Sequence, residues 1–174
     1  MKKRFARIIP LGLLAAGLAL GSAGCNLSPV GDPIGRLTAR TGCKSVSAQG
    51  AQSAEPFQIE NRECVEYDYD GKSVLRLRHI NAGFNCCPGE ITATFLLTNG
   101  EIRIKEKESS SLCDCLCLYD IAYEFVNARP GLTRITIVGP YQPGEDPPLE
   151  FLADLGGATS GTFCVERTRY PWSY

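Results

Sequence analysis

The chain has 174 residues, of which 21% are charged and 9% aromatic, as in a globular protein with one core. Four of its 18 Lys and Arg residues lie within the first seven positions, which leaves 14 cations against 19 Asp and Glu residues. This mildly acidic remainder, without a basic stripe in the sequence, argues against nucleic-acid binding, because phosphate recognition needs clustered cations.

The first 24 residues have the layout of a bacterial export signal. MKKRFAR at 1–7 is cationic, IIPLGLLAAGLAL at 8–20 is apolar, and small residues lead to Cys25. The apolar run is shorter than the roughly 20 residues that a helix needs to cross a bilayer. SAGC at 22–25 resembles a lipobox, with Ser22 where a large aliphatic residue is usual. We predict cleavage after residue 24 and lipidation of Cys25. The alternative is an ordinary cleaved signal that leaves this thiol free.

Residues 25–57 are predicted to be the lipid anchor and a flexible tether. The stretch 26–56 is rich in Ser, Gly, Ala, Pro, Thr and Gln, and it has few large apolar side chains. Such a segment cannot bury enough surface to fold alone. Triacylation of Cys25 would supply more than the two lipid chains that make a membrane anchor stable. The folded domain is therefore expected at 58–174.

Alternation of apolar and polar residues dominates the sequence after residue 57. The expected strands are 62–69, 73–80, 91–97, 101–107, 117–126, a segment around 135–137, 149–155 and 162–168. Turn signals separate them at Asp70-Gly71, at Asn99-Gly100 and at 127–131. About eight short strands without a long helical period predict an all-β fold, an antiparallel β-sandwich stapled by disulfides.

One face of each strand is expected to line the core. The residues predicted to be buried are Tyr119, Ile121, Tyr123, Phe125, Ile135 and Ile137. His79, the only histidine, has the parity of Leu75 and Leu77, so a structural role is favoured over pairing with a cysteine nucleophile. The acids Glu101, Glu106 and Glu108 interleave with lysines, which is typical of a solvated edge strand.

Nine cysteines less the lipidated Cys25 leave an even number, which in an oxidising compartment predicts four disulfides. They are Cys43, Cys64, Cys86, Cys87, Cys113, Cys115, Cys117 and Cys164. If 113–117 (CDCLC) is extended, its cysteines share a face about 7 Å apart, too far to bond one another. Each must then reach outside this row, and two of the five other cysteines are left to pair. Cys86 or Cys87, in the loop 81–89, is expected within reach of the row.

The same cysteines allow other interpretations. One alternative to structural disulfides without a cofactor is a thiolate site for Zn or Cu. Its ligands would come from Cys86, Cys87, Cys113, Cys115 and Cys117. CxC spacing differs from that of structural zinc sites, and oxidation competes with thiolate ligation. A thiol–disulfide redox role would need an exposed cysteine with a lowered pKa.

The remaining polar and aromatic clusters indicate no catalytic set. Asp68 and Asp70 flank a turn and are interpreted as turn residues. A carboxylate pair of glycosidase type is conceivable, but nothing in the sequence selects its two members. The sequence has no phosphate-cradling loop, no Ser/His/Asp set and no H-E-x-x-H. An aromatic surface, or the closure of one end of the sandwich, could come from Tyr141, Tyr170, Trp172 and Tyr174.

Four segments carry a resemblance to a protein family. They are HINAGFNCCP at 79–88, CDCLCLYD at 113–120, GPY at 139–141 and CVERTRYPW at 164–172. Together they resemble an uncharacterised family of bacterial, often Bacteroidetes-type, secreted proteins or lipoproteins, over residues 64–172. The resemblance implies the class of protein and adds no mechanism.

The sequence therefore predicts a membrane-anchored extracytoplasmic lipoprotein that acts as a binding or structural module of the cell envelope. It would be periplasmic or surface-exposed, with the outer membrane favoured. The expected partner is the membrane, through the lipid on Cys25. A protein or glycan partner is left unspecified, and nucleic acid is not expected. The alternatives are a metal-thiolate envelope protein and a small thiol-redox or hydrolytic enzyme.

Overall fold

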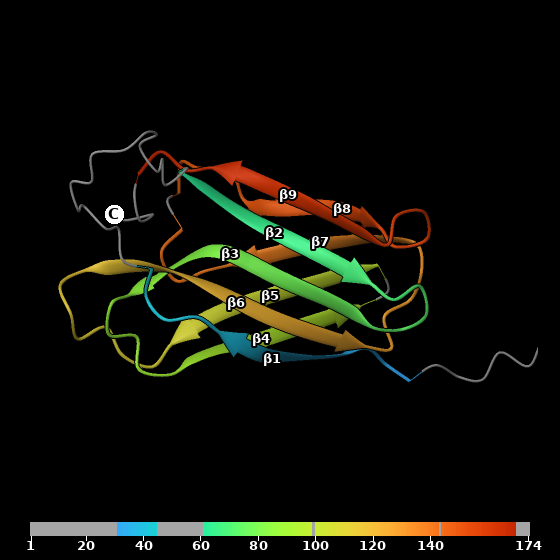
Figure 1. The fold of residues 1–174 in the computed structure, drawn as a ribbon, viewed down its shortest axis with the longest axis horizontal. Coiled ribbons are helices and arrows are strands. Elements are labelled where there is room, and N and C mark those ends of the chain that lie inside the picture. The colour runs from blue at the N-terminus through green and yellow to red at the C-terminus, as the bar shows by residue number, and fades with distance from the viewer. Residues whose placement is uncertain (1–30, 45–60, 99, 143, 170–174) are drawn as a thin grey trace, which may run out of the picture. The chain divides into compact units, whose positions relative to one another are not determined.

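The computed structural model describes residues 31–44, 61–98, 100–142 and 144–169, which form nine strands in two sheets (Figure 1). The described residues contain no helix, and thus none that could span a membrane. Sheet A has the strand order β1-β6-β3-β2-β9, and sheet B has the order β4-β5-β7-β8. The bounds are β1 Ile34–Arg40, β2 Arg62–Tyr69, β3 Leu75–Asn85, β4 Ile91–Thr98, β5 Glu101–Glu108, β6 Leu116–Val126, β7 Leu132–Val138, β8 Leu149–Asp154 and β9 Ser160–Glu166. The predicted all-β sandwich is confirmed.

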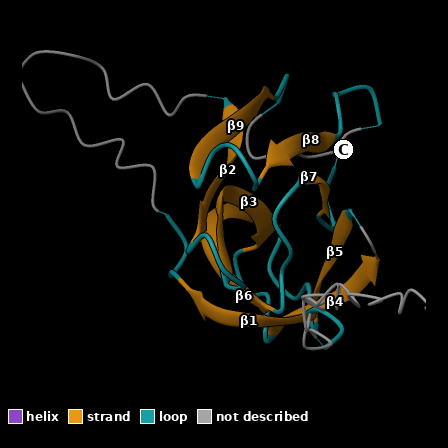
Figure 2. Ribbon diagram, turned by 90° about the vertical axis from the view of Figure 1, so that its right-hand side faces the viewer, coloured by secondary structure: helices purple, strands orange, loops and turns teal. Residues whose placement is uncertain are grey.

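All strand pairs are antiparallel except β5 and β7, which run parallel. The two sheets curve around a common interior, as Figure 2 shows from the end of the sandwich. Their edges meet, because β1 lies beside β4 and β8 lies beside β9. The two sheet faces therefore cover the core from two sides. The adjacent edge strands, β1 with β4 and β8 with β9, close the other two sides.

The core consists of the inward rows that alternation predicts. The six core residues expected from the sequence are all 2% exposed or less. Phe95 of β4 packs edge-to-face against Tyr123 and Phe125 of β6, with ring centroids 6.0 and 5.5 Å apart. Such aromatic contacts join the two sheets and add to the stability gained by burial of the rings.

Strand β1 lies inside the segment predicted to be a tether, so that prediction is wrong for Ile34–Arg40. The strand pairs along β6, from Ile34 opposite Val126 to Arg40 opposite Ile121. Low apolar content shows that a segment cannot fold alone, but an edge strand needs only one partner for its backbone and few buried side chains. The domain therefore begins before residue 58, and 45–57 lies outside the described residues.

The predicted turns occur where glycine permits a positive φ. Thr98 pairs with Glu101, so the hairpin tip is at 99–100 as predicted, with φ +81° at Gly100. Asn99 itself lies outside the described residues. The loop 70–74 is longer than a two-residue turn, and the Asp70 carboxylate organises it by accepting backbone N–H bonds of 2.8–2.9 Å. These bonds, led by the one from Val74, lower the pKa of Asp70.

The expectation that β5 is a solvated edge strand is wrong. β5 lies between β4 and β7, and its inward row runs Ile102, Ile104, Glu106. Glu106 is 2% exposed. Acidic and basic residues alternate along 105–108, but the lysines face out while Glu106 faces in. The polarity of a strand does not reveal its place in the sheet, because buried partners from other strands can compensate a charge.

Candidate functional site

One end of the sandwich is crosslinked by three disulfides, Cys43–Cys117, Cys86–Cys115 and Cys87–Cys113. The fourth, Cys64–Cys164, joins neighbouring strands β2 and β9 of sheet A. Each cysteine of the 113–117 row therefore bonds outside the row, and the two left over pair with each other, as the spacing predicts. The expected proximity of Cys86 and Cys87 to the row is confirmed. Cys25 lies outside the described residues.

The row itself is not fully extended. β6 begins only at Leu116, so Cys113 and Cys115 lie in the bend before it and Cys117 alone faces the core. Asn85 orders this bend by accepting N–H bonds from Cys87 and Cys113 and donating to the Cys113 carbonyl at 2.6 Å. The Cys86 N–H also donates to the Cys115 carbonyl at 3.0 Å. These bonds hold the segment 85–87 against the segment 113–115.

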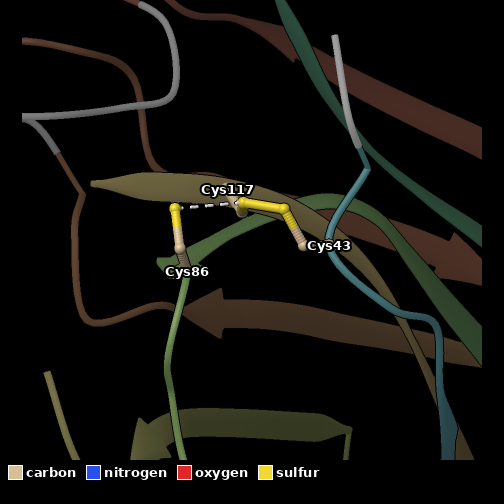
Figure 3. Close-up of side chains that lie close together, drawn as sticks. All are labelled: Cys43, Cys86 and Cys117. Atoms are coloured by element: carbon tan, nitrogen blue, oxygen red, sulfur yellow. Dashed lines mark hydrogen bonds between the residues drawn. A yellow bond between two sulfur atoms is a disulfide. The ribbon is translucent and has the colours of Figure 1, made fainter. Parts of the chain in front are cut away.

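Two of these disulfides lie in contact with each other. The Sγ atoms of Cys86 and Cys117 are 3.3 Å apart, and those of Cys43, Cys86 and Cys117 all lie within 4.8 Å of one another (Figure 3). This group does not match the five cysteines considered for a metal site, because it takes in Cys43 and leaves out Cys87, Cys113 and Cys115. All these sulfurs are in disulfides, and a metal needs thiolates as ligands.

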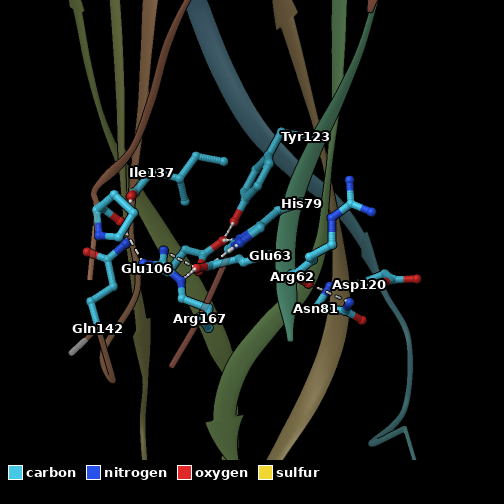
Figure 4. Close-up of polar contacts among 11 residues, drawn as sticks. Arg62, Glu63, His79, Asn81, Glu106, Asp120, Tyr123, Ile137, Gln142 and Arg167 are labelled. Carbon is cyan, nitrogen blue, oxygen red and sulfur yellow. Dashed lines mark hydrogen bonds and ion pairs between the residues drawn. The ribbon is translucent and has the colours of Figure 1, made fainter. Parts of the chain in front are cut away.

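A second polar cluster is buried between the sheets (Figure 4). His79 of β3 lies between two carboxylates, with Nδ1 2.7 Å from Glu106 Oε1 and Nε2 2.7 Å from Glu63 Oε1. Tyr123 donates its O–H to Glu106 Oε1 at 2.5 Å. Arg167, just after β9, donates from Nε to Glu63 Oε2 at 2.5 Å and from Nη1 to the Pro147 carbonyl at 2.7 Å. The structural role predicted for His79 agrees with this burial.

The geometry matches a charged histidine. Both ring nitrogens of His79 face carboxylate oxygens, and only the imidazolium form can donate from both. Burial works against this charge, but the charges and hydrogen bonds of Glu106 and Glu63 raise the pKa of His79 to about 10. Burial would likewise raise the pKa of Glu63, yet its bond to His79 and the charges of His79 and Arg167 lower it. Two cations then balance two carboxylates, as burial of charge demands.

This cluster links the two sheets. Its five residues are at most 3% exposed, so His79 and the two carboxylates of this cluster are closed off from solvent. Burial and the charge of Glu106 raise the pKa of the Tyr123 hydroxyl, which stays a donor. Sequence reasoning missed Glu63, Glu106 and Arg167. The sequence does indicate the burial of Glu106, because this residue continues the alternating row of Ile102 and Ile104 and therefore faces the same side of the strand.

A groove of about 580 Å³ runs over the outer face of sheet A. Strands β1, β2, β3, β6 and β9 all line it, and its floor includes Ala122 and Gly161. The charged lining residues are Glu66, Asp68, Arg76, Arg78 and Glu124, and the serine and threonine hydroxyls are those of Thr38, Ser160 and Thr162. The groove therefore offers many hydrogen-bond donors and acceptors.

The charges of the groove are paired across the strands. Arg76 lies 3.7 Å from Asp68 and 3.5 Å from Glu124, and Arg78 lies 3.5 Å from Glu66. Arg78 also bonds Asp120 at 2.9 Å. Both partners of the Arg76–Asp68 pair are more than half exposed, so this ion pair is weak and can reorganise around a ligand.

Asp120 is held more firmly than the other acids of this face. Its carboxylate pairs with Lys44 and Arg78 and accepts the Asn81 N–H at 3.2 Å. Burial opposes its charge, but the bonds from Lys44, Asn81 and Arg78 lower the pKa of Asp120. This carboxylate therefore ties the segment after β1 to β3 and β6.

Of the four aromatic residues considered for a binding surface, only Tyr141 lies within the described residues. Tyr141 donates its O–H to Glu108 Oε1 at 2.5 Å, while Tyr170, Trp172 and Tyr174 lie outside the described residues. Asp70 organises its loop as predicted, whereas Asp68 faces the groove.

No model of a known protein family, no curated protein and no solved structure matches this chain.

Proposed function

We propose that the chain is a membrane-anchored extracytoplasmic lipoprotein whose folded domain is a binding module of the cell envelope. The groove on the outer face of sheet A carries the binding role. Its volume of about 580 Å³ is in the range of small-ligand sites, and five strands build its floor. A site on strands is held rigidly by the backbone ladders beneath it.

The leader and the four disulfides support the location. The cationic, apolar and small-residue stretches that end at Cys25 are those of a lipoprotein signal. Disulfides persist in oxidising compartments outside the cytoplasm. Gly31 follows Cys25 by six residues, which span about 20 Å at most. A lipid on Cys25 would therefore hold the domain close to the bilayer surface.

The lining of the groove indicates a polar ligand. Interleaved arginines, carboxylates and hydroxyls suit a molecule that has both donors and acceptors and little net charge. Glycan chains of the cell envelope have this chemistry, since hydroxyl groups donate and accept. Exposed ion pairs such as that of Arg76 and Asp68 cost little to rearrange around such hydroxyls.

The test is binding of soluble envelope glycans to the purified full-length protein, measured by affinity electrophoresis. We expect Arg78→Ala to weaken binding at least tenfold. Arg134→Ala is the matched control, because Arg134 is similarly exposed (50% against 54%) and pairs with Glu150 on the outer face of sheet B. Equal retention of both variants, or no glycan retention by the wild type, would contradict the proposal.

A further inference from the structure

We propose that Cys115, Cys86, Cys117 and Cys43 form a thiol–disulfide exchange relay, which takes electrons from an external dithiol at Cys115 and delivers them to Cys43. This activity is independent of the groove. It uses two of the four disulfides, and it makes the protein a substrate or partner of dithiol proteins of the same compartment.

The relay rests on contact between two disulfides. Cys86 Sγ lies 3.3 Å from Cys117 Sγ, although these two sulfurs belong to different disulfides. In Figure 3, Cys117 lies between Cys86 and Cys43. A thiolate at Cys86 would therefore have Cys117 as the nearer sulfur of the Cys43–Cys117 bond.

Exposure marks the two ends of the relay. Cys115 and Cys43 are exposed, Cys86 is half-buried, and Cys117 is 6% exposed. An external thiolate can thus reach Cys115, while the internal attack occurs on a sulfur that solvent reaches poorly. Exchange rates depend on access and on which sulfur is attacked. The entry and exit points of the relay are therefore its two accessible cysteines.

The first step is attack by a thiolate of the external dithiol on Cys115 Sγ. A mixed disulfide forms there, the Cys86–Cys115 bond breaks, and its electron pair leaves on Cys86 as a thiolate. Cys86 then attacks Cys117 Sγ. The Cys86–Cys117 bond forms, the Cys43–Cys117 bond breaks, and Cys43 leaves as a thiolate that takes up a proton.

The last step releases the dithiol. Its second thiol loses a proton and attacks the mixed disulfide, which forms the intramolecular disulfide of the external partner and frees Cys115 to take up a proton. The partner is oxidised by two electrons. The protein exchanges two disulfides for one, Cys86–Cys117, and two thiols, Cys43 and Cys115. The covalent link between β6 and the segment after β1 is thereby opened.

The test uses Cys115→Ser in the full-length protein, which leaves Cys86 as a thiol without any reductant. Alkylation with iodoacetamide under native conditions, followed by peptide mapping, should then find label on Cys43 as well as Cys86, together with a Cys86–Cys117 disulfide. Cys113→Ser is the matched control. It frees Cys87, which lies outside the three-sulfur group, so label should be confined to Cys87.

Label restricted to Cys86 in folded Cys115→Ser, or equal label on Cys43 in both variants, would overturn the relay. If Cys115→Ser does not fold, wild-type protein is treated with substoichiometric dithiothreitol and quenched with iodoacetamide. The relay predicts Cys43 and Cys115 as the first labelled pair. Labelling of Cys86 with Cys115, or of a pair outside the four cysteines, would overturn it.

Discussion

At the scale of single residues, the buried cluster shows how a charge is kept inside a β-sandwich. His79 donates to Glu63 of its own sheet and to Glu106 of the other sheet, so one imidazolium links the two layers. Glu106 Oε2 is buried and has no hydrogen-bond partner among the described residues. The cluster is therefore sensitive to the loss of any one member, because the remaining charges would stay buried without compensation.

The first prediction concerns pH. The pKa of His79 is about 10 in the folded protein and about 6.5 in an unfolded chain, so its contribution to stability is complete below pH 6.5 and is lost as pH rises toward 10. The native state keeps a proton that the unfolded chain has released. Urea midpoints, measured with the disulfides intact, should fall steadily from pH 7 to pH 9.

Glu106→Gln is the control for this pH effect, because it removes the carboxylate that raises the pKa of His79 most. The slope of the urea midpoint against pH should then be smaller than in the wild type. A wild-type midpoint that stays constant between pH 7 and pH 9 would show that His79 is not protonated in the fold.

The second prediction concerns core packing. Ile121 of β6 is fully buried, so Ile121→Ala should lower the free energy of unfolding by about 2–5 kcal/mol through lost burial and a residual cavity. Leu132→Ala is the control, because Leu132 is 67% exposed and should cost under about 0.5 kcal/mol. Denaturant titration measures both. Equal costs would mean that the inward face of β6 is wrongly assigned.

At the scale of elements, the disulfides join segments that the sheets already bring together. Cys64 and Cys164 stand opposite each other on paired strands, while Cys43, Cys86 and Cys87 come from segments after β1 and β3. The loop around Cys86 has few backbone hydrogen bonds to neighbouring strands. Its conformation therefore depends on the disulfides and on the hydrogen bonds of Asn85. The Cys64–Cys164 bond instead closes a long loop of chain.

The third prediction compares two disulfides by the chain they close. Cys64 and Cys164 are 100 residues apart, whereas Cys87 and Cys113 are 26 apart. In the chain-entropy account the first bond closes the longer loop, and Cys86–Cys115 already closes almost the same loop as Cys87–Cys113, so loss of the second bond costs less. The double alanine variant of the first pair should therefore be the less stable one in urea. A more stable Cys64→Ala/Cys164→Ala variant would contradict this account.

At the scale of the whole domain, the two ends of the sandwich differ. β1 starts opposite the end of β6, at the end with the loop 70–74 and the hairpin tip at 99–100 (Figure 1). The disulfide-rich loops lie at the other end, where β3 finishes and β6 begins.

The fourth prediction tests the proposed lipid anchor. Cys25→Ala removes the proposed acceptor of lipid, so the protein should move from the membrane fraction to the soluble periplasm or medium. Fractionation followed by immunoblotting measures this, and Asn26→Ala, which keeps the cysteine, is the control. Membrane retention of Cys25→Ala with its signal cleaved would show that lipid on Cys25 is not the anchor.

The sequence by itself determined most of the strands after residue 61, their inward rows, the hairpin at 99–100 and the pairing of the CDCLC cysteines outside their own row. Strand β3 runs on to Asn85, into the predicted loop 81–89, and β6 begins only at Leu116, so the row is not the extended strand that the pairing argument assumed. These features follow from local geometry, since the side-chain period of a strand and the reach of a disulfide depend only on neighbours in the chain. Alternation therefore placed Ile121 and Tyr123 in the core before any strand order was known.

Only the tertiary structure decided the place of β1, the burial of Glu106, the partner of each cysteine and the groove across sheet A. Each depends on which strands become neighbours, and a period of two residues contains no information about strand order. β1 is a strand because β6 completes its backbone bonds. Glu106 is inside because His79 and Tyr123, from the opposite sheet, supply the donors that its sequence neighbours do not.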